Sequence, residues 1–159
     1  LCDPKIIRAL KQAAQAGVEI NLIVRGICCL IPEVPQKTEN IHVRSIVGRH
    51  LEHARAFLFE NGGDHEVYLS SADWMQRNLY TRVELMFPIK DEKLRQAVEN
   101  VLDLQWNDTE KCSHRRSDGQ YVLYRRGMGG LNVQETMLKD IQGVFEGKYL
   151  DHQDETMAE

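Results

Sequence analysis

The stretch HARAFLFENGGDHEVYLSSADW, residues 53–74, decides the fold. Two short apolar runs in it, Ala56–Phe59 and Glu66–Ser70, are typical of strands. Between them lies Asn61-Gly62-Gly63-Asp64, which has the residue types that tight turns require. The stretch therefore predicts an antiparallel hairpin.

The residues before the hairpin give a helix signal followed by strand signals. Asp3 and Pro4 are typical of a helix start, because a carboxylate caps free N–H groups and proline has none to leave unpaired. Apolar residues follow at helical spacing as far as Gly17, a typical helix stop. A strand, a loop with two prolines and a second strand are then predicted over residues 18–24, 26–40 and 41–47. Helix, glycine and strand in this order indicate an α/β fold.

The residues after the hairpin predict a further strand over 82–89 and a helix that begins at Asp91. The apolar side of this helix comprises Leu94, Ala97, Val98, Val101 and Leu102. Residues 107–119 are polar and irregular. The remaining predicted segments are a strand over 121–124, a link with Gly127, Gly129 and Gly130, a helix over 133–145 and a frayed tail over 150–159.

Composition restricts the classes of function. The chain has 159 residues, enough for one domain, and a net charge of −4, so its surface as a whole does not indicate a nucleic-acid partner. The four cysteines have no zinc-like or redox-like spacing, and we expect reduced thiols and no metal site. Any site for a polyanion must therefore be local.

Polar side chains gather where three successive predicted strands begin or end, the region where open α/β sheets bind ligands. They follow the first strand, flank the hairpin and open the next strand. This candidate site comprises Arg25, His53, Arg55, Ser70, Ser71, Asp73, Asn78, Arg82 and Glu84.

These residue types suit phosphoryl transfer. Arginine holds two phosphate oxygens with its planar fork of donors and never loses its charge. Histidine accepts a phosphoryl group when neutral and gives a proton to a leaving oxygen when charged. Ser70 and Ser71 could bond phosphate oxygens, or orient the imidazole together with Glu84 or Asp73.

Structural roles remain open for the same residues. Arg77 and Arg82 could simply pair with Asp73 and Glu84, and Trp74 could be a core anchor. Five other histidines are assigned to the surface or to packing: His42, His50, His65, His114 and His152. Composition and spacing alone make a phosphate site plausible and no more.

The pattern His53-x-Arg55-x-x-x-x-Glu60, followed by Ser70-Ser71-Ala72-Asp73, resembles the phospholipase D superfamily motif. Arginine stands here where that motif has lysine, and glutamate where it has aspartate. Asp73 takes the place of the usual asparagine. These departures argue against ordinary phosphodiesterase chemistry.

A narrower family fits better. The stretches LIVRGICCLIP (22–32), IHVRSIVGRHLEHARAFLFENGG (41–63) and VYLSSADWMQRNLYTRVELMFPI (67–89) resemble bacterial polyphosphate kinase of the first type. The resemblance covers residues 1–107 strongly and continues more weakly through the last predicted helix. It implies that the whole chain is one C-terminal, phospholipase D-like α/β domain of a longer enzyme, with a mixed β-sheet flanked by helices.

The resemblance also implies a function. The family moves the terminal phosphate of ATP onto polyphosphate, reversibly, through a phosphohistidine on a preceding domain. His53 matches the assisting histidine of the second domain, and Arg25 matches an arginine that contacts nucleotide phosphates. The Mg²⁺ ligands and the phosphorylated histidine lie in other domains, so we expect this chain alone to be inactive. The implied partners are ATP or ADP, polyphosphate, the preceding domains and, in the full enzyme, other copies of the same chain in a homo-oligomer; nucleic acid is not among them.

Two alternatives stay open: a phospholipase D-like phosphodiesterase or nuclease completed by dimerisation, and a non-catalytic module that binds polyphosphate or nucleotide. We expect a cytoplasmic location, with peripheral membrane association as a further alternative. The role of His53 as an acid, an electrostatic clamp or a nucleophile is also left open.

Overall fold

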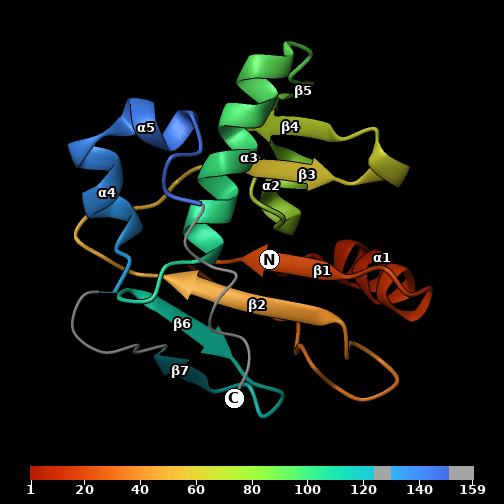
Figure 1. The fold of residues 1–159 in the computed structure, drawn as a ribbon. Helices are drawn as coiled ribbons and strands as arrows, with labels where there is room; N and C mark the ends of the chain where they lie inside the picture. Colours follow the sequence, from red (N-terminus) through yellow and green to blue (C-terminus); the bar gives the residue numbers. More distant parts are fainter. Residues whose placement is uncertain (124–129, 151–159) are drawn as a thin grey trace.

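The strands form two separate sheets with helices beside both of them (Figure 1). This computed structural model describes residues 1–123 and 130–150. One sheet has four strands in the order β1-β2-β6-β7, and the other has three in the order β3-β4-β5. Parallel and antiparallel pairs both occur. The predicted α/β class with mixed strand pairing is confirmed, and the structure adds the division into two sheets.

Helix α1 (Pro4–Gln15) begins where the sequence predicts. Asp3 Oδ1 accepts hydrogen bonds from the backbone N–H of Lys5 at 3.0 Å and of Ile6 at 2.9 Å. These bonds satisfy donors that the first turn of a helix leaves unpaired. The chain then turns at Gly17, whose φ of +92° is in the left-handed region that favours glycine.

Strands β1 (Ile20–Ile23) and β2 (Ile41–Ile46) pair in parallel, with Ile20 opposite Ile41. Helix α1 packs on this pair and closes one hydrophobic core. Its buried members include Ala14, Leu30, Ile41 and Val43. The core holds the C-terminal end of β1, and with it Arg25, at a defined edge of the sheet.

Strands β6 (Cys112–Arg115) and β7 (Tyr121–Leu123) extend this sheet in antiparallel fashion beyond β2. The prediction that residues 107–119 are irregular is wrong for β6. Asp108 accounts for the difference, because its Oδ1 accepts backbone hydrogen bonds from Glu110 (3.0 Å), Lys111 (2.6 Å) and Cys112 (3.0 Å). The carboxylate thereby turns the chain into β6 despite the polar sequence of that strand.

The second sheet contains the predicted hairpin. Strands β3 (Ala56–Phe59) and β4 (Glu66–Ser70) pair in antiparallel fashion, with Phe57 opposite Tyr68. The 3₁₀ turn Asn61–Gly63 joins them. The hairpin prediction is confirmed in both position and pairing.

The segment after the hairpin differs from the prediction. Residues 76–81, for which no helix was predicted, form the short helix α2 (Gln76–Thr81), and the strand predicted over 82–89 is shorter and forms β5 (Met86–Pro88). Helix α2 is too short for a clear apolar period. Its buried Asn78 is bonded to a later residue, which a reading of local periodicity does not detect.

Helix α3 (Glu92–Trp106) begins at the predicted cap, where Asp91 Oδ1 accepts from the N–H of Leu94 at 3.0 Å. The apolar side of the helix shifts toward its C-terminal half, since Leu94 is exposed and Leu104 is buried. The long helix predicted over 133–145 is two helices, α4 (Val133–Lys139) and α5 (Ile141–Phe145). They meet at Asp140, whose extended φ of −154° interrupts α4 and whose side chain caps α5.

Residues 124–129 and 151–159 lie outside the described residues, so the predictions for Tyr124, Gly127, Gly129 and most of the tail are not addressed. Over residues 1–123 and 130–150, no helix has the length and apolar character that crossing a membrane requires.

Candidate phosphate site

Three of the predicted residues meet at the open end of the hairpin. Arg55 lies between His53 and Asp73: its Nε donates to Asp73 Oδ1 at 2.9 Å, and its Nη2 lies 2.8 Å from His53 Nε2. A third bond runs from Arg55 Nη1 to the backbone oxygen of His53 at 3.1 Å. His53 is exposed, so the cluster opens toward solvent.

Backbone pairing holds this cluster. The N–H of Ser70 donates to the carbonyl of Arg55 at 2.9 Å, so the residue that ends β4 is aligned with Arg55. Phe57 and Trp74 stack with ring centroids 4.9 Å apart. The stack fixes the loop that carries Asp73, and Trp74 is therefore a packing anchor in this structure.

Charge reinforces the contact. The hydrogen bond from Arg55 lowers the pKa of Asp73, and this outweighs the opposing effect of burial. The same hydrogen bond raises the pKa of Arg55. Asp73 therefore pairs with Arg55 and not with Arg77, the partner that the sequence left open. Both groups stay charged at neutral pH.

A second group lies next to the first. Ser71 Oγ donates to Glu84 Oε2, and Asn78 Nδ2 donates to Glu84 Oε1 at 3.0 Å. These hydrogen bonds, that from Ser71 first, lower the pKa of Glu84, and the charge of Arg82 acts in the same direction. Ser70 Oγ instead donates to the backbone oxygen of Leu85 at 3.0 Å. Neither serine contacts the imidazole of His53 in this structure.

Arg25 lies in a loop beside the other sheet. It is exposed, two residues after the end of β1, and hydrogen bonds among the described residues do not join it to either group. Leu1 and Cys2 bridge the two loops: the N-terminal amine of Leu1 donates to Ile27 O at 2.6 Å, and the N–H of Cys2 donates to Trp74 O at 2.9 Å. The loop with Arg25 and the loop with Asp73 are therefore neighbours.

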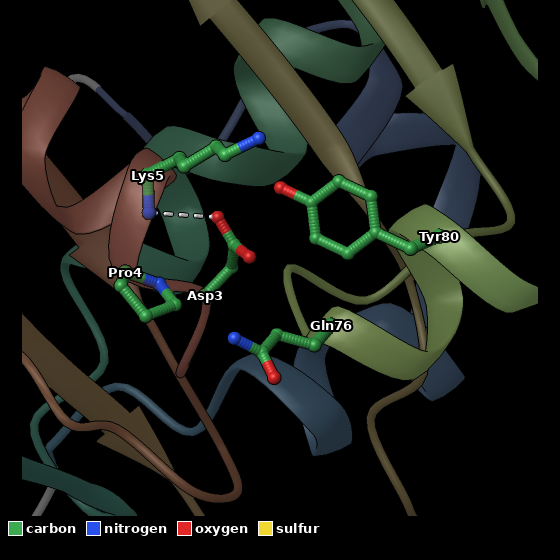
Figure 2. Close-up of a pocket in the computed structure, with 5 residues that line it drawn as sticks. All are labelled: Asp3, Pro4, Lys5, Gln76 and Tyr80. Atoms are coloured by element: carbon green, nitrogen blue, oxygen red, sulfur yellow. Dashed lines mark hydrogen bonds between the residues drawn. The ribbon is translucent and has the colours of Figure 1, made fainter.

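A hollow of about 320 Å³ lies between the start of α1 and helix α2. Figure 2 shows Lys5 of α1 and Tyr80 of α2 on opposite sides of it, with the Lys5 Nζ 5.3 Å from the Tyr80 ring centroid. Asp3 and Gln76 also line it. The sequence gives no signal for this hollow, because its walls come from helices about seventy residues apart.

The structure contains a third polar group, which the sequence-based prediction did not include. Glu33 Oε1 lies 3.1 Å from His42 Nδ1 and 2.9 Å from His114 Nε2. Burial raises the pKa of Glu33, but the hydrogen bonds from His42 and His114 outweigh it, and the pKa is lowered overall. Nothing in the sequence links residues 33, 42 and 114: the pairing of β2 with β6 brings the two histidines near each other, and Glu33 comes from the loop before β2.

Among the residues that the structure describes, the side chains that could ligate a metal do not gather at one place. In residues 1–123 and 130–150, the histidine, cysteine, aspartate and glutamate side chains form no group of three or more that could hold a metal ion.

Comparison with known proteins identifies the family. Residues 1–134 match the model of the polyphosphate kinase C-terminal domain 2. The chain belongs to this family, and the resemblance inferred from its motifs is confirmed.

Individual proteins that resemble this chain are also polyphosphate kinases. A polyphosphate kinase of Pseudomonas aeruginosa is 54% identical over 143 residues, which cover 89% of this chain and 21% of that protein. Polyphosphate kinase 1 of Chlorobaculum tepidum is 50% identical over 139 residues, covering 87% of this chain and 20% of that protein. The crystal structure of polyphosphate kinase from Porphyromonas gingivalis superposes with a TM-score of 0.85 at 41% identity, covering 92% of this chain and 22% of that chain. This chain thus spans about a fifth of the length of these relatives.

Proposed function

We propose that this chain supplies the assisting half of an ATP:polyphosphate phosphotransferase site. The observation that carries the proposal is the cluster of His53, Arg55 and Asp73, which presents an imidazole and a guanidinium side by side at an exposed sheet end. Membership of the polyphosphate kinase family supports the choice of reaction, in which the terminal phosphate of ATP passes reversibly to polyphosphate.

Each residue has a distinct role in this proposal. Arg25 and Arg55 bind phosphate oxygens, since guanidinium groups match them in charge and geometry. His53 stabilises or protonates the departing ADP oxygen. Ser70, Ser71, Asp73, Asn78, Arg82 and Glu84 support these three groups. Phosphoryl transfer needs mainly such positioning and charge stabilisation.

The phosphorylated histidine is assigned to another part of the enzyme, outside this chain. The apolar surface beside the site supports this. Val83 and Leu85 flank Glu84 in sequence, and Val83 is fully exposed while Leu85 is 63% exposed. Tyr80, Met86 and Phe87, nearby in the sequence, are also exposed. Exposed apolar groups next to half a site are what a partner domain would cover.

The remaining expectations follow from the family. ATP or ADP and polyphosphate are the proposed substrates, with Mg²⁺ held by ligands outside this chain and a homo-oligomer in the full enzyme. Nucleic acid is not a proposed partner. The free thiols of Cys2, Cys28, Cys29 and Cys112 support a cytoplasmic location.

The decisive experiment uses a chimaera in which this chain replaces the matched region of the Pseudomonas aeruginosa enzyme. We expect His53→Ala to lower kcat about 10²- to 10⁴-fold with little change in ATP affinity, the range for loss of a general acid. Arg8→Ala, an exposed arginine on α1, is the matched surface control. Unchanged turnover in His53→Ala would refute the role of His53.

The isolated chain offers a second test. We expect no polyphosphate synthesis and weak binding of tripolyphosphate in calorimetry, because half a site lacks preorganised partners. Binding should weaken about tenfold in Arg25→Ala and in Arg55→Ala, the typical cost of a lost charge-assisted hydrogen bond, and stay unchanged in Arg8→Ala. Synthesis by the chain alone, or cleavage of a phosphodiester, would contradict the proposal and favour a complete site of another kind.

A further inference from the structure

The two residues that differ from the phospholipase D-like motif at positions 55 and 73 form an ion pair with each other. Arg55 stands where lysine is usual, and Asp73 stands where asparagine is usual. In the structure Arg55 Nε donates to Asp73 Oδ1 at 2.9 Å. The arginine side chain is 18% exposed and the aspartate side chain 44% exposed, so the arginine is shielded from much of the solvent and the carboxylate only partly. Lysine has its three N–H donors on one nitrogen, whereas arginine places separate nitrogens against Asp73 and His53 in a fixed planar geometry.

The other edge of the guanidinium determines the state of His53. Arg55 Nη2 lies 2.8 Å from His53 Nε2. Arginine keeps all its protons and accepts no hydrogen bond, so Nη2 is the donor and His53 Nε2 is the acceptor. An acceptor Nε2 carries no proton, and the proton of the neutral ring is then on Nδ1.

Asp73 holds the guanidinium in this place. It bonds Nε, which leaves Nη1 and Nη2 directed at the carbonyl oxygen and the ring of His53. The N–H of Met75 donates to Asp73 O at 2.7 Å, so the carboxylate sits in a constrained turn. The other candidates for orienting the imidazole are occupied, since Ser71 and Glu84 bond each other.

We propose that Asp73 is a positioning residue that acts through Arg55 and holds His53 as the neutral Nδ1–H tautomer with Nε2 facing the guanidinium. The importance of this state for catalysis rests on the proposed function. This is the state of the chain without substrate: the Nη edge that holds His53 is also the edge suited to two phosphate oxygens, so bound phosphate would replace the ring on Arg55 and free His53 Nε2. The state of the ring itself is a property of this chain and is measured without any turnover.

The test is a long-range ¹H–¹⁵N correlation spectrum of the His53 ring in the isolated chain. It is recorded at about pH 8.5, well above the ordinary histidine pKa of ~6.5. We expect the Nδ1–H form to dominate in the wild-type chain. In Asp73→Asn the ratio of Nδ1–H to Nε2–H should fall roughly tenfold, the effect of weakening one charge-assisted hydrogen bond. Asp73→Glu, which keeps the carboxylate, should restore part of the ratio.

Asp64→Asn, at the exposed turn end of the same hairpin, controls for the loss of a carboxylate and should leave the ratio unchanged. A dominant Nε2–H form in the wild-type chain would overturn the proposal, whether or not any variant folds. An unchanged ratio in a folded Asp73→Asn chain would overturn it as well. If His53→Ala abolishes turnover of the chimaera but Asp73→Asn leaves the ratio of Nδ1–H to Nε2–H unchanged, the proposed function is supported and the positioning role of Asp73 is refuted.

Discussion

Asn78 donates from Nδ2 to Glu84 Oε1 at 3.0 Å and so ties helix α2 to the residues that lead into β5. Asn78 is only 6% exposed. The second carboxylate oxygen of Glu84 accepts from Ser71 Oγ, and Ser71 Oγ also accepts from the N–H of Leu85 at 3.0 Å. The Glu84 carboxylate therefore joins the segment after β4, helix α2 and the residues before β5.

Replacement of Asn78 tests this connection. We expect Asn78→Ala to lower the free energy of unfolding by about 1–3 kcal/mol, because a buried hydrogen-bonded amide is lost beside the Glu84 carboxylate. The measurement is a urea titration followed by circular dichroism. Asn21→Ala, on an exposed position of β1, is the control and should stay within about 0.5 kcal/mol of the wild-type chain. Equal stability of the two variants would contradict the role of Asn78.

Asp108 provides a sharper stability test, since it is fully buried. Its Oδ1 accepts three backbone hydrogen bonds at the start of β6, and its Oδ2 accepts from the N–H of Val133 at 2.9 Å. Asp108→Asn replaces one acceptor oxygen with an NH₂ group, which places donor against donor. We expect a loss of about 3 kcal/mol in the free energy of unfolding, because a buried N–H is left unpaired. Measurement is by thermal and urea unfolding.

Asp118→Asn is the matched control for this change. Asp118 also accepts a backbone hydrogen bond, from Gln120 at 2.9 Å, but at an exposed turn. Water satisfies the N–H there when the acceptor is lost, so we expect a change of about 0.5 kcal/mol or less. A loss at Asp118 as large as that at Asp108 would show that burial is not the deciding factor.

Much of the fold could be predicted because its signals are local. Asp3 and Asp91 cap helices through bonds to residues two or three positions on, and the hairpin turn carries its own glycines. Strand β6 could not be predicted, because the side chain that shapes it also bonds Val133, 25 residues away. The break at Asp140 was not predicted because apolar residues recur at helical spacing on both sides of it. A single polar residue within such a pattern is also typical of the exposed face of a continuous helix.

The candidate site shows the same limit. The rule that polar groups collect at strand ends brought His53, Arg55 and Asp73 into one prediction, and the structure places them in contact. It did not specify partners, because the pairing of Asp73 with Arg55 depends on the alignment of β3 with β4. No local sequence pattern indicates the group of Glu33, His42 and His114, since its three members come from a loop and two separate strands.

Acid titration should reveal the pairing of Glu33. Its pKa is lower in the folded chain than in the unfolded one, because the hydrogen bonds from His42 and His114 outweigh burial. Between the ordinary glutamate pKa of about 4.3 and the lower folded value, the unfolded state binds more protons, so stability rises with pH. The contribution of Glu33 is thus present above that window and is lost as pH falls through the folded pKa.

We therefore expect Glu33→Gln to be less stable than the wild-type chain near neutral pH, with the difference shrinking as pH falls through the folded pKa of Glu33 below about 4.3. Urea unfolding at a series of pH values measures it. Glu19→Gln, at an exposed position before β1, should show a small difference at every pH. A Glu33→Gln difference that does not depend on pH would mean that His42 and His114 do not stabilise the charged carboxylate.

The hairpin turn allows a test of backbone strain with no change in packing. Gly63 has a φ of +96°, and a Cβ added there would meet no atom within 4 Å. We expect Gly63→Ala to cost about 1–2 kcal/mol in unfolding free energy, because a residue with a Cβ is strained at positive φ. Gly26 has equally open surroundings and no φ in the left-handed region, so Gly26→Ala should be neutral or slightly stabilising. Both variants would be compared by urea unfolding. If Gly63→Ala were as stable as Gly26→Ala, residues 61–64 could connect β3 to β4 without the left-handed turn, and the turn would not set the hairpin register.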